Sequence, residues 1–378
     1  MREMTLTIGS LCSGYGGLDQ AVQSVLGGDL AWVADPDPGA TKILKHHHPD
    51  VPNLGDITAL AWSTVPQVDV FTGGYPCQPF SQAGLRKGIE DERHIWPHIC
   101  DAICVLRPRL VVLENVRGHL RRGFDSVLAD LARIGFDASW VCVRASDVGA
   151  PHRRERLFVI AWPKGERPYF PRRPADAGGP GGVVPGGVTL LPTPDAYQGS
   201  RGGSQDPAKR RAGGHSVSLA DVVEHLLPTP RARDSKGRGY DDQLPNVIED
   251  LSLLPTPRAS GGAHGGPNQR GSKGDLALPA AVQPEHFAQY AAAIARWEPT
   301  MGRQVPAPTD PTGKGGRAQL SPRFVEWVMG LPADHVTAPE IGLTRAEQLH
   351  ALGNGVVPKQ GEMALRLLLE RVTAEVAA

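Results

Sequence analysis

The sequence has few cysteines, no long apolar run and no net charge, and each shortage excludes a class of protein. The five cysteines, Cys12, Cys77, Cys100, Cys104 and Cys142, are an odd number without CxxC spacing, so neither a disulfide framework nor a zinc site is indicated. No stretch of about 18 apolar residues occurs, and the first residues lack the basic-then-apolar order of a secretory signal. A cytoplasmic protein without membrane attachment is therefore expected.

The balance of charge excludes a uniformly basic coat for nucleic acid. Lysine and arginine number 40, as do aspartate and glutamate, so any basic surface must be local. The chain is 40% apolar and 21% charged, which is typical of a globular protein. Its 378 residues exceed one average domain, so two domains are expected.

Composition changes sharply near Pro163. Residues 163–319 hold 21 of the 35 prolines and 24 of the 45 glycines, so we expect little regular packing there. Before this point, short apolar runs alternate with amphipathic stretches, which predicts a mostly parallel α/β sheet with helices on both faces. We predict an α/β domain over 1–162, a smaller irregular region over 163–319, and a C-terminal segment over 320–378 that returns to the first domain.

Chemically informative residues follow several of the expected strands, and ligands of such sheets bind beyond the carboxyl ends of the strands. They are the glycine turn CSGYGG at 12–17, Asp35 after AWVA, Asp56 in NLGDIT, Cys77 after VDVFTGG, and Glu114 and Asn115 in LVVLENV. Each alone has a simpler explanation, such as a tight connection for the turn, a helix cap for Asp35 or an inert buried thiol for Cys77. Three acids, a thiol and a glycine turn at one edge instead favour a shared site.

Taken together, these stretches resemble the DNA (cytosine-5) methyltransferases, which depend on S-adenosylmethionine (AdoMet). The matching segments, in the family's usual order, are LCSGYGGLDQAV, VADPD, GDIT, GGYPCQPFSQAG, LENV, APHRRERLFVIAW, LSPRFVEWVMGLP and GNGVVP. They cover residues 5–162 and 320–360. The resemblance implies a Rossmann-like class I methyltransferase fold, with an AdoMet-binding catalytic domain in 1–162 and a target-recognition region in 163–319.

The chemistry of cytosine methylation explains why these residue types are needed. C5 of cytosine is a poor nucleophile, but addition of a thiolate at C6 gives an enamine whose C5 can attack a sulfonium methyl group. Cys77 is the expected nucleophile, and Glu114 is the acid expected to donate a proton or strong hydrogen bond at N3. Because C5 and C6 are inaccessible inside stacked duplex, the base must flip out.

The resemblance also assigns the remaining residues of the substrate site. Arg156 would hold the cytosine O2, Arg154 would order the site or the backbone, and Pro76 and Asn115 would contact substrate. A guanidinium suits the first role because its planar fork can donate to O2 and to an anion together. His152 stands where the family more often has glutamine, which puts a role for it in doubt. Without the resemblance, HRRER reads as a solvated basic run.

AdoMet, with S-adenosylhomocysteine as its product, is the implied cofactor, and no metal is expected. Asp35 would accept hydrogen bonds from the ribose hydroxyls, and Asp56 would meet the adenine amino group. Backbone of the glycine turn would approach the methionine part. The full set assigned to the cofactor is Cys12, Ser13, Gly14, Gly16, Gly17, Asp35, Pro36, Asp56, Ile57, Asn354 and Val356.

The middle region repeats the sequence LLPTP at 190–194, 226–230 and 253–257. Basic glycine-rich loops between such apolar anchors would suit a DNA groove and its phosphates, and a flexible low-complexity insertion is the alternative. Arg231 and Arg233 follow the second copy and would point in opposite directions from an extended chain. We expect one of them to meet phosphate and the other a base.

The predicted function is methyl transfer from AdoMet to C5 of a flipped-out cytosine in a specific duplex DNA sequence, through a covalent Cys77–C6 adduct. A tRNA methyltransferase of the same fold is disfavoured by the large middle region. A catalytically silent DNA-binding module would be expected to lack Cys77, Glu114 or the glycine turn. Double-stranded DNA and a separately encoded restriction endonuclease are the expected partners of a monomer in a bacterial or virus-infected bacterial cell.

Overall fold

Residues 5–76, 95–166, 253–262, 266, 268–270, 274–313 and 315–375 are described by the structure, a computed structural model. Cys77, Arg231 and Arg233 lie outside these residues, as do the first two LLPTP copies. The roles assigned to them stay predictions.

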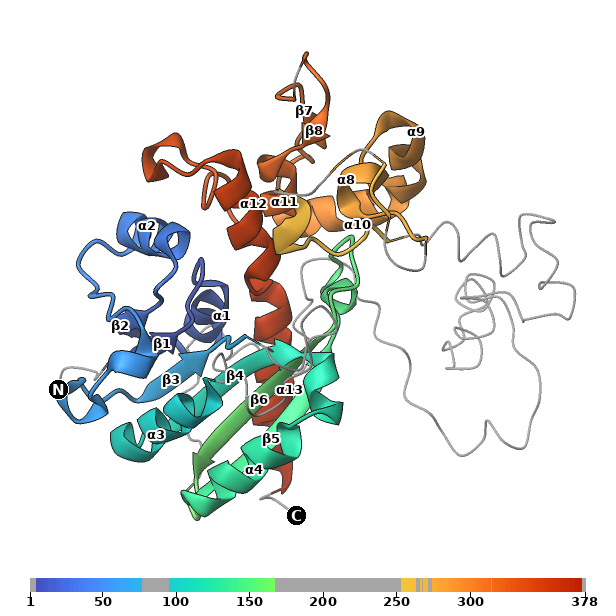
Figure 1. Cartoon of the computed structure of the whole chain (residues 1–378). Coiled ribbons are helices and arrows are strands. Elements are labelled where there is room, and N and C mark those ends of the chain that lie inside the picture. The colour runs from blue at the N-terminus through green and yellow to red at the C-terminus, as the bar shows by residue number, and fades with distance from the viewer. Residues whose placement is uncertain are drawn as a thin grey trace, which may run out of the picture.

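A six-stranded sheet holds the first half of the chain. Its strands are β1 (Thr7–Leu11), β2 (Asp29–Ala34), β3 (Val70–Gly73), β4 (Leu110–Val116), β5 (Phe136–Val143) and β6 (Arg156–Pro163). They lie in the order β2-β1-β3-β4-β6-β5 (Figure 1). The first four strands are parallel, and β6 is antiparallel to both β4 and β5. The predicted mostly parallel sheet is confirmed, with an antiparallel pair at one edge.

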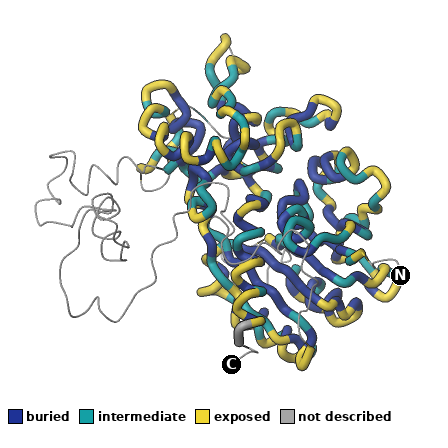
Figure 2. The backbone as a smooth tube through the Cα atoms, turned by 180° about the vertical axis from the view of Figure 1, so that it is seen from behind, coloured by how far each residue is buried: buried dark blue, intermediate teal, exposed yellow. Residues whose placement is uncertain are grey.

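Helices cover both faces of the sheet, as predicted. One face carries α1 (Gly17–Leu26), α2 (Pro38–His47) and α13 (Pro358–Glu375), and the other carries α3 (Trp96–Leu106) and α4 (Phe124–Arg133). Leu18 and Val22 of α1 and Leu368 of α13 share one apolar core with the sheet, while Ile103 of α3 and Leu131 of α4 belong to the core on the other face. The central strands are buried between these layers (Figure 2).

The C-terminal part forms a second, helical layer beyond one end of the sheet (Figure 1). It contains α8 (Leu278–Ala281), α9 (Pro284–Phe287), α10 (Ala291–Met301), α11 (Pro322–Val328), α12 (Arg345–Asn354) and a short hairpin of β7 (Thr309–Asp310) and β8 (Gln319–Leu320). Trp297 of α10 is fully buried and donates from Nε1 to the carbonyl of Trp327 in α11, at 3.0 Å.

The expectation of little regular packing throughout 163–319 is wrong for the stretch that contains α8, α9 and α10. The alanine-rich run AAAIARW has high helix propensity and supplies apolar residues at helical spacing, which outweighs Pro299 in the last turn. One apolar core crosses the proposed boundary at 319, since it includes residues on both sides of it. The domain limits therefore stay predictions. None of the helices in the described part of the chain is long and apolar enough to cross a membrane.

Candidate active site

A cavity of about 560 Å³ opens at the carboxyl ends of β1, β2, β3 and β4, where the strand pattern predicts a ligand. Most of the residues predicted from sequence line it. They are Cys12, Ser13, Gly14, Gly17, Asp35, Pro36, Asp56, Ile57, Pro76, Glu114, Asn115, Arg156, Asn354 and Val356. Gly16 and Arg154 do not line it. Ser10, Asp19, Tyr75, Ile95 and His350 also line the cavity, although sequence reasoning did not single them out.

The glycine turn is packed directly against the C-terminal segment that closes the cavity. A Cβ added to Gly17 would overlap the carbonyl oxygen of Val356, so only glycine allows this approach. The Tyr15 hydroxyl, inside the same turn, donates to that carbonyl at 2.7 Å. Residues about 340 positions apart in the chain thus form one wall.

Asp35 links the end of β2 to the glycine turn. Its Oδ2 accepts from the Gly14 N–H at 2.8 Å, and its Oδ1 accepts from the Asp37 N–H at 2.9 Å. Asn53 holds its backbone on both sides, donating to the Asp35 carbonyl and accepting from its N–H, each at 3.0 Å. Burial raises the pKa of this carboxyl, and the two backbone hydrogen bonds partly oppose the shift. Each carboxylate oxygen keeps a second lone pair that can accept from a ligand hydroxyl.

The expectation that Asp56 ends a strand of the sheet is wrong. Asp56 instead caps the short 3-10 helix η1 (Ile57–Ala59), where its Oδ1 accepts from both the N–H and the hydroxyl of Thr58 at 2.9 Å. These bonds lower the pKa of the exposed carboxyl. The residue still lines the cavity, and Ile57 beside it is buried.

Glu114 and Arg156 form an ion pair at the far side of the cavity. Arg156 Nε donates to Glu114 Oε1 at 2.8 Å, and both side chains are largely buried. The two residues lie close together because β6 is antiparallel to β4: β6 begins where β4 ends, and Arg156 pairs with Val116. Burial raises the pKa of Glu114, while Arg156 and Arg154 lower it in part. The carboxyl can therefore hold a proton closer to neutral pH than an ordinary glutamate.

Asn115 holds the chain that leads to the predicted nucleophile. Its Nδ2 donates to the carbonyl of Tyr75 at 3.2 Å, and the Tyr75 hydroxyl is hydrogen-bonded to Nε2 of His119 at 2.9 Å. Pro76, the next residue, lines the cavity. The described chain thus ends at this cavity, one residue before Cys77, which lies outside the described residues.

Arg154 is buried and contacts backbone rather than the cavity. Its Nη1 donates to the carbonyl of Pro257 at 3.1 Å, and its Nη2 donates to the carbonyls of Gly353 and Gly355 at 3.1 and 2.7 Å. Its side chain therefore joins the third LLPTP copy to the segment GNGVVP. Burial, aided by Arg156, lowers the pKa of Arg154 to about 9, so it remains protonated at neutral pH.

The third LLPTP copy docks against residues 151–154, the segment that leads into β6. Leu254 is buried, donates from its N–H to the Pro151 carbonyl at 2.7 Å and forms a parallel bridge with His152. Thr256 Oγ1 accepts from the Arg154 N–H at 3.2 Å. The sequence predicted apolar anchors in this region but not the segment against which this copy packs.

His152 is a buried structural residue. Its Nε2 donates to the carbonyl of Val328 at 3.0 Å, which anchors α11 beside the start of β6, and the side chain does not line the cavity. Burial, together with Arg154, lowers the pKa of His152 to about 3, so the ring is neutral. This placement answers the doubt about residue 152: within the described structure it supports the site from outside.

Residues 6–177 match the family model described as C-5 cytosine-specific DNA methylase. The first part of the chain, from β1 to just beyond β6, is thus similar to the C-5 cytosine-specific DNA methylases. Among curated relatives, it is 40% identical over 118 residues to the Type II methyltransferase M.AplI of Arthrospira platensis, covering 29% of this chain and 34% of the relative. It is 30% identical over 167 residues to the Type II methyltransferase M.DsaV of Dactylococcopsis salina, covering 43% and 47%. The matches thus span between a third and a half of these relatives.

Solved structures share the fold of this chain over nearly its whole length. The S. pombe Dnmt2 methyltransferase superposes with a TM-score of 0.54 at 17% identity, covering 97% of this chain and 99% of that one. The Entamoeba histolytica methyltransferase EhMeth gives 0.53 at 14% identity, covering 98% and 99%. At such identities the likeness supports the Rossmann-like methyltransferase fold alone.

Proposed function

We propose that this protein transfers a methyl group from AdoMet to C5 of a cytosine in duplex DNA. One observation carries the proposal. A single cavity joins the glycine turn and Asp35 on one side to the buried Glu114–Arg156 pair on the other. The first group suits a nucleoside cofactor and the second suits a polar heterocycle, so donor and acceptor of a group transfer would lie side by side.

The charge of the cavity fits a cationic cofactor. Four aspartates line it, Asp19, Asp35, Asp37 and Asp56, whereas Arg156, the only arginine or lysine among its described residues, is already paired with Glu114. A negative lining attracts the sulfonium and ammonium groups of AdoMet, and Pro36 and Ile57 offer apolar contact for the adenine. Bound AdoMet would supply an electrophilic methyl group on positively charged sulfur.

The residues on the other side of the cavity would handle the base. The Cys77 thiolate would add to C6 while Glu114 protonates or hydrogen-bonds N3, which places the electron pair at C5 for attack on the methyl group. Arg156, already held by Glu114, would donate to the cytosine O2. Transfer of the C5 proton to water, return of the N3 proton to Glu114 and expulsion of the thiolate would then restore the aromatic ring, leaving 5-methylcytosine and S-adenosylhomocysteine.

The reaction would require a flipped-out base and a cellular partner. The target cytosine would be flipped out of the duplex, because the cavity receives a single base and the reacting atoms are covered inside the stack. The relatives are named Type II methyltransferases, so the proposed partner is a separately encoded restriction endonuclease with the same recognition sequence. The protein would act as a monomer in a bacterial cytoplasm.

Transfer of radiolabelled methyl from AdoMet tests the function. We expect label to enter duplex DNA at C5 of cytosine within one recognition sequence, located by sequencing of methylated positions. The same assay with transfer RNA in place of DNA tests the alternative substrate. Label in tRNA but not in DNA would support the alternative activity, and label in neither would contradict the proposal.

Asp35→Ala should weaken AdoMet binding by about 1 to 3 kcal/mol, or roughly 5- to 150-fold in Kd, because ribose hydroxyls lose their acceptor and the Gly14 N–H loses its partner. Calorimetric titration with AdoMet measures the change. Asp29→Ala is the matched control, since Asp29 is exposed at the opposite end of the same strand. Equal affinity in the Asp35 variant and the wild type would remove Asp35 from the site.

A further inference from the structure

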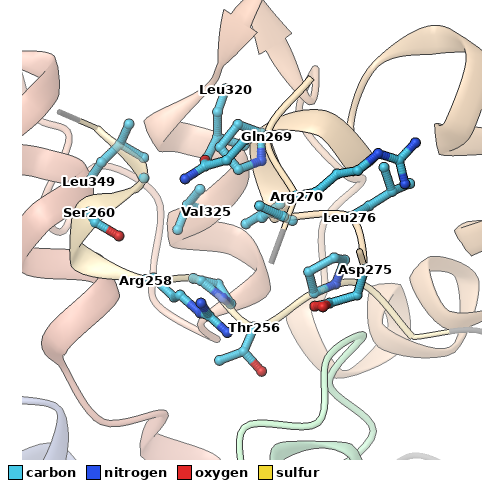
Figure 3. Close-up of a pocket in the computed structure, with 16 residues that line it drawn as sticks. Thr256, Arg258, Ser260, Gln269, Arg270, Asp275, Leu276, Leu320, Val325 and Leu349 are labelled. Carbon is cyan, nitrogen blue, oxygen red and sulfur yellow. The ribbon is translucent and has the colours of Figure 1, made fainter. Parts of the chain in front are cut away.

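A second cavity, of about 260 Å³, lies in the C-terminal layer beside the third LLPTP copy. Its walls come from the segments 255–258, 260–261, 269–270 and 275–279, and from β8, α11 and α12 (Figure 3). Leu276, Leu278, Leu320, Val325 and Leu349 give it apolar walls, and Arg258, Gln269 and Asp275 add polar groups. The cavity thus combines apolar and polar surface, as a site for a planar molecule with polar edges requires.

Its polar groups differ in whether they already have partners. Arg258 and Asp275 are exposed, and neither forms a hydrogen bond or ion pair through its side chain within the described residues. Gln269 Oε1 is buried without a hydrogen-bond partner there. Arg270, in contrast, donates to the carbonyl of Gly274 at 2.9 Å, and its side chain extends away from the cavity (Figure 3). A donor fork and two acceptors are therefore available for a ligand.

The two cavities are separated by little more than one segment of backbone. A Cβ added to Gly353, which lines the first cavity, would overlap the backbone of Ala259 and of Arg258, and Arg258 lines the second cavity. Arg154 holds this partition by donating to the carbonyls of Pro257 and Gly353. The second cavity thus adjoins the first, which makes a nucleotide next to the target base the candidate occupant of the second.

The repeat supports the assignment of Arg258. It directly follows the third LLPTP copy, as Arg231 directly follows the second. Arg231 was expected from sequence to contact DNA and lies outside the described residues. Arg258 occupies the equivalent position in the third copy, within the described residues, and it lines a cavity.

We propose that the second cavity binds an unstacked guanine base next to the target cytosine, an inference that rests on the proposed methyl transfer to DNA. Guanine offers two acceptors, O6 and N7, which match the guanidinium of Arg258. It also offers donors at N1 and N2, which match the carboxylate of Asp275. Adenine and cytosine each have a single amino group as donor, and thymine has only its N3–H. Guanine is therefore the one base with two adjacent donors for Asp275 and also two adjacent acceptors, O6 and N7, for Arg258.

Methylation of a random-sequence duplex pool, read by sequencing, tests the proposal. The wild type should show guanine at one position beside the methylated cytosine. Arg258→Ala and Asp275→Asn should each reduce this preference by about 5- to 150-fold, the usual cost of one mismatched position, while other positions are unaffected. Arg133→Ala is the control, since Arg133 is exposed on α4, lines neither cavity and pairs with Asp130 at 3.1 Å; it should leave every preference unchanged. Unchanged preference in both test variants overturns the proposal.

Modified bases at that position show which edge is bound. 7-Deazaguanine lacks N7 and should impair the wild type but not Arg258→Ala. Inosine lacks the N2 amino group and should impair the wild type but not Asp275→Asn. If the wild type accepts inosine as well as guanine, the base is read in the duplex groove by the arginine alone, and the cavity proposal is wrong.

Nucleotide binding separates this proposal from the methyl-transfer function. In an NMR titration, the wild type should bind 2′-deoxyguanosine 5′-monophosphate at least about 5-fold more tightly than the adenine nucleotide, and Arg258→Ala should lose the difference. Equal binding of the two nucleotides counts against the cavity even if DNA is methylated. Selective binding of the guanine nucleotide without any methyl transfer would instead indicate that the proposed activity has failed.

Discussion

Glu114→Ala is expected to lower the rate of methyl transfer by about 10² to 10⁴-fold, the usual contribution of a general acid. The variant removes the group placed to donate at N3, and it also leaves the largely buried Arg156 without its 2.8 Å partner. AdoMet should still bind, because Asp35 and the glycine turn are unaffected. Single-turnover measurements with saturating AdoMet and DNA give the rate, and calorimetry gives the cofactor affinity.

Glu114→Gln is the matched variant, since glutamine keeps the size of the side chain and can still accept from Arg156. As pH rises through the folded pKa of Glu114, which burial raises, the wild type loses its proton donor and its rate should fall. Glutamine does not ionise, so its slower rate should lack this decline. A Glu114→Ala enzyme with wild-type rate, or the same alkaline decline in Glu114→Gln, would show that Glu114 is no acid in this reaction.

Arg154→Ala should reduce the free energy of unfolding by about 3 to 5 kcal/mol, because it leaves the carbonyls of Pro257, Gly353 and Gly355 unpaired and opens a cavity at a buried position. It should also weaken both AdoMet and DNA binding, since the side chain joins the cofactor wall to the third LLPTP copy. Urea unfolding measures the loss.

Arg153→Ala is the control for this effect. Arg153 is exposed and pairs with Glu155 at 3.3 Å, so its removal should cost at most about 1 kcal/mol. If the two variants unfold at the same urea concentration, the three carbonyl contacts do not stabilise the protein and Arg154 is not a structural link between the two regions.

The fold and most of the cavity lining could be predicted because both depend on local patterns. Apolar runs such as LVVLENV identify buried strands, and parallel strands bring their carboxyl ends to one edge, so Asp35 and Glu114 had to lie near each other. The resemblance assigned both Gly17 and Val356 to the cofactor site, but their close approach was not predicted, since no local signal connects residues so far apart in the sequence.

Contacts made through tertiary packing could not be predicted. Nothing in HRRER distinguishes Arg154, which contacts three carbonyls, from Arg156, which pairs with Glu114, because the difference depends on the antiparallel start of β6 and on the docked segment 254–257. Asp56 was misplaced for a related reason. An aspartate that precedes Ile-Thr fits both a strand end and a helix cap, and the cap prevailed.

The central claim, covalent catalysis by a thiol at this cavity, is tested most directly by trapping with duplex DNA that contains 5-fluorocytosine at the methylated position. Fluorine cannot leave C5 as a proton does, so the wild type with AdoMet should form a protein–DNA adduct that survives denaturing electrophoresis. Cys77→Ser should form none while still binding AdoMet, because an alkoxide is far harder to form than a thiolate near neutral pH. An adduct that persists in Cys77→Ser, or its absence in a wild-type protein that methylates ordinary DNA, would contradict the account.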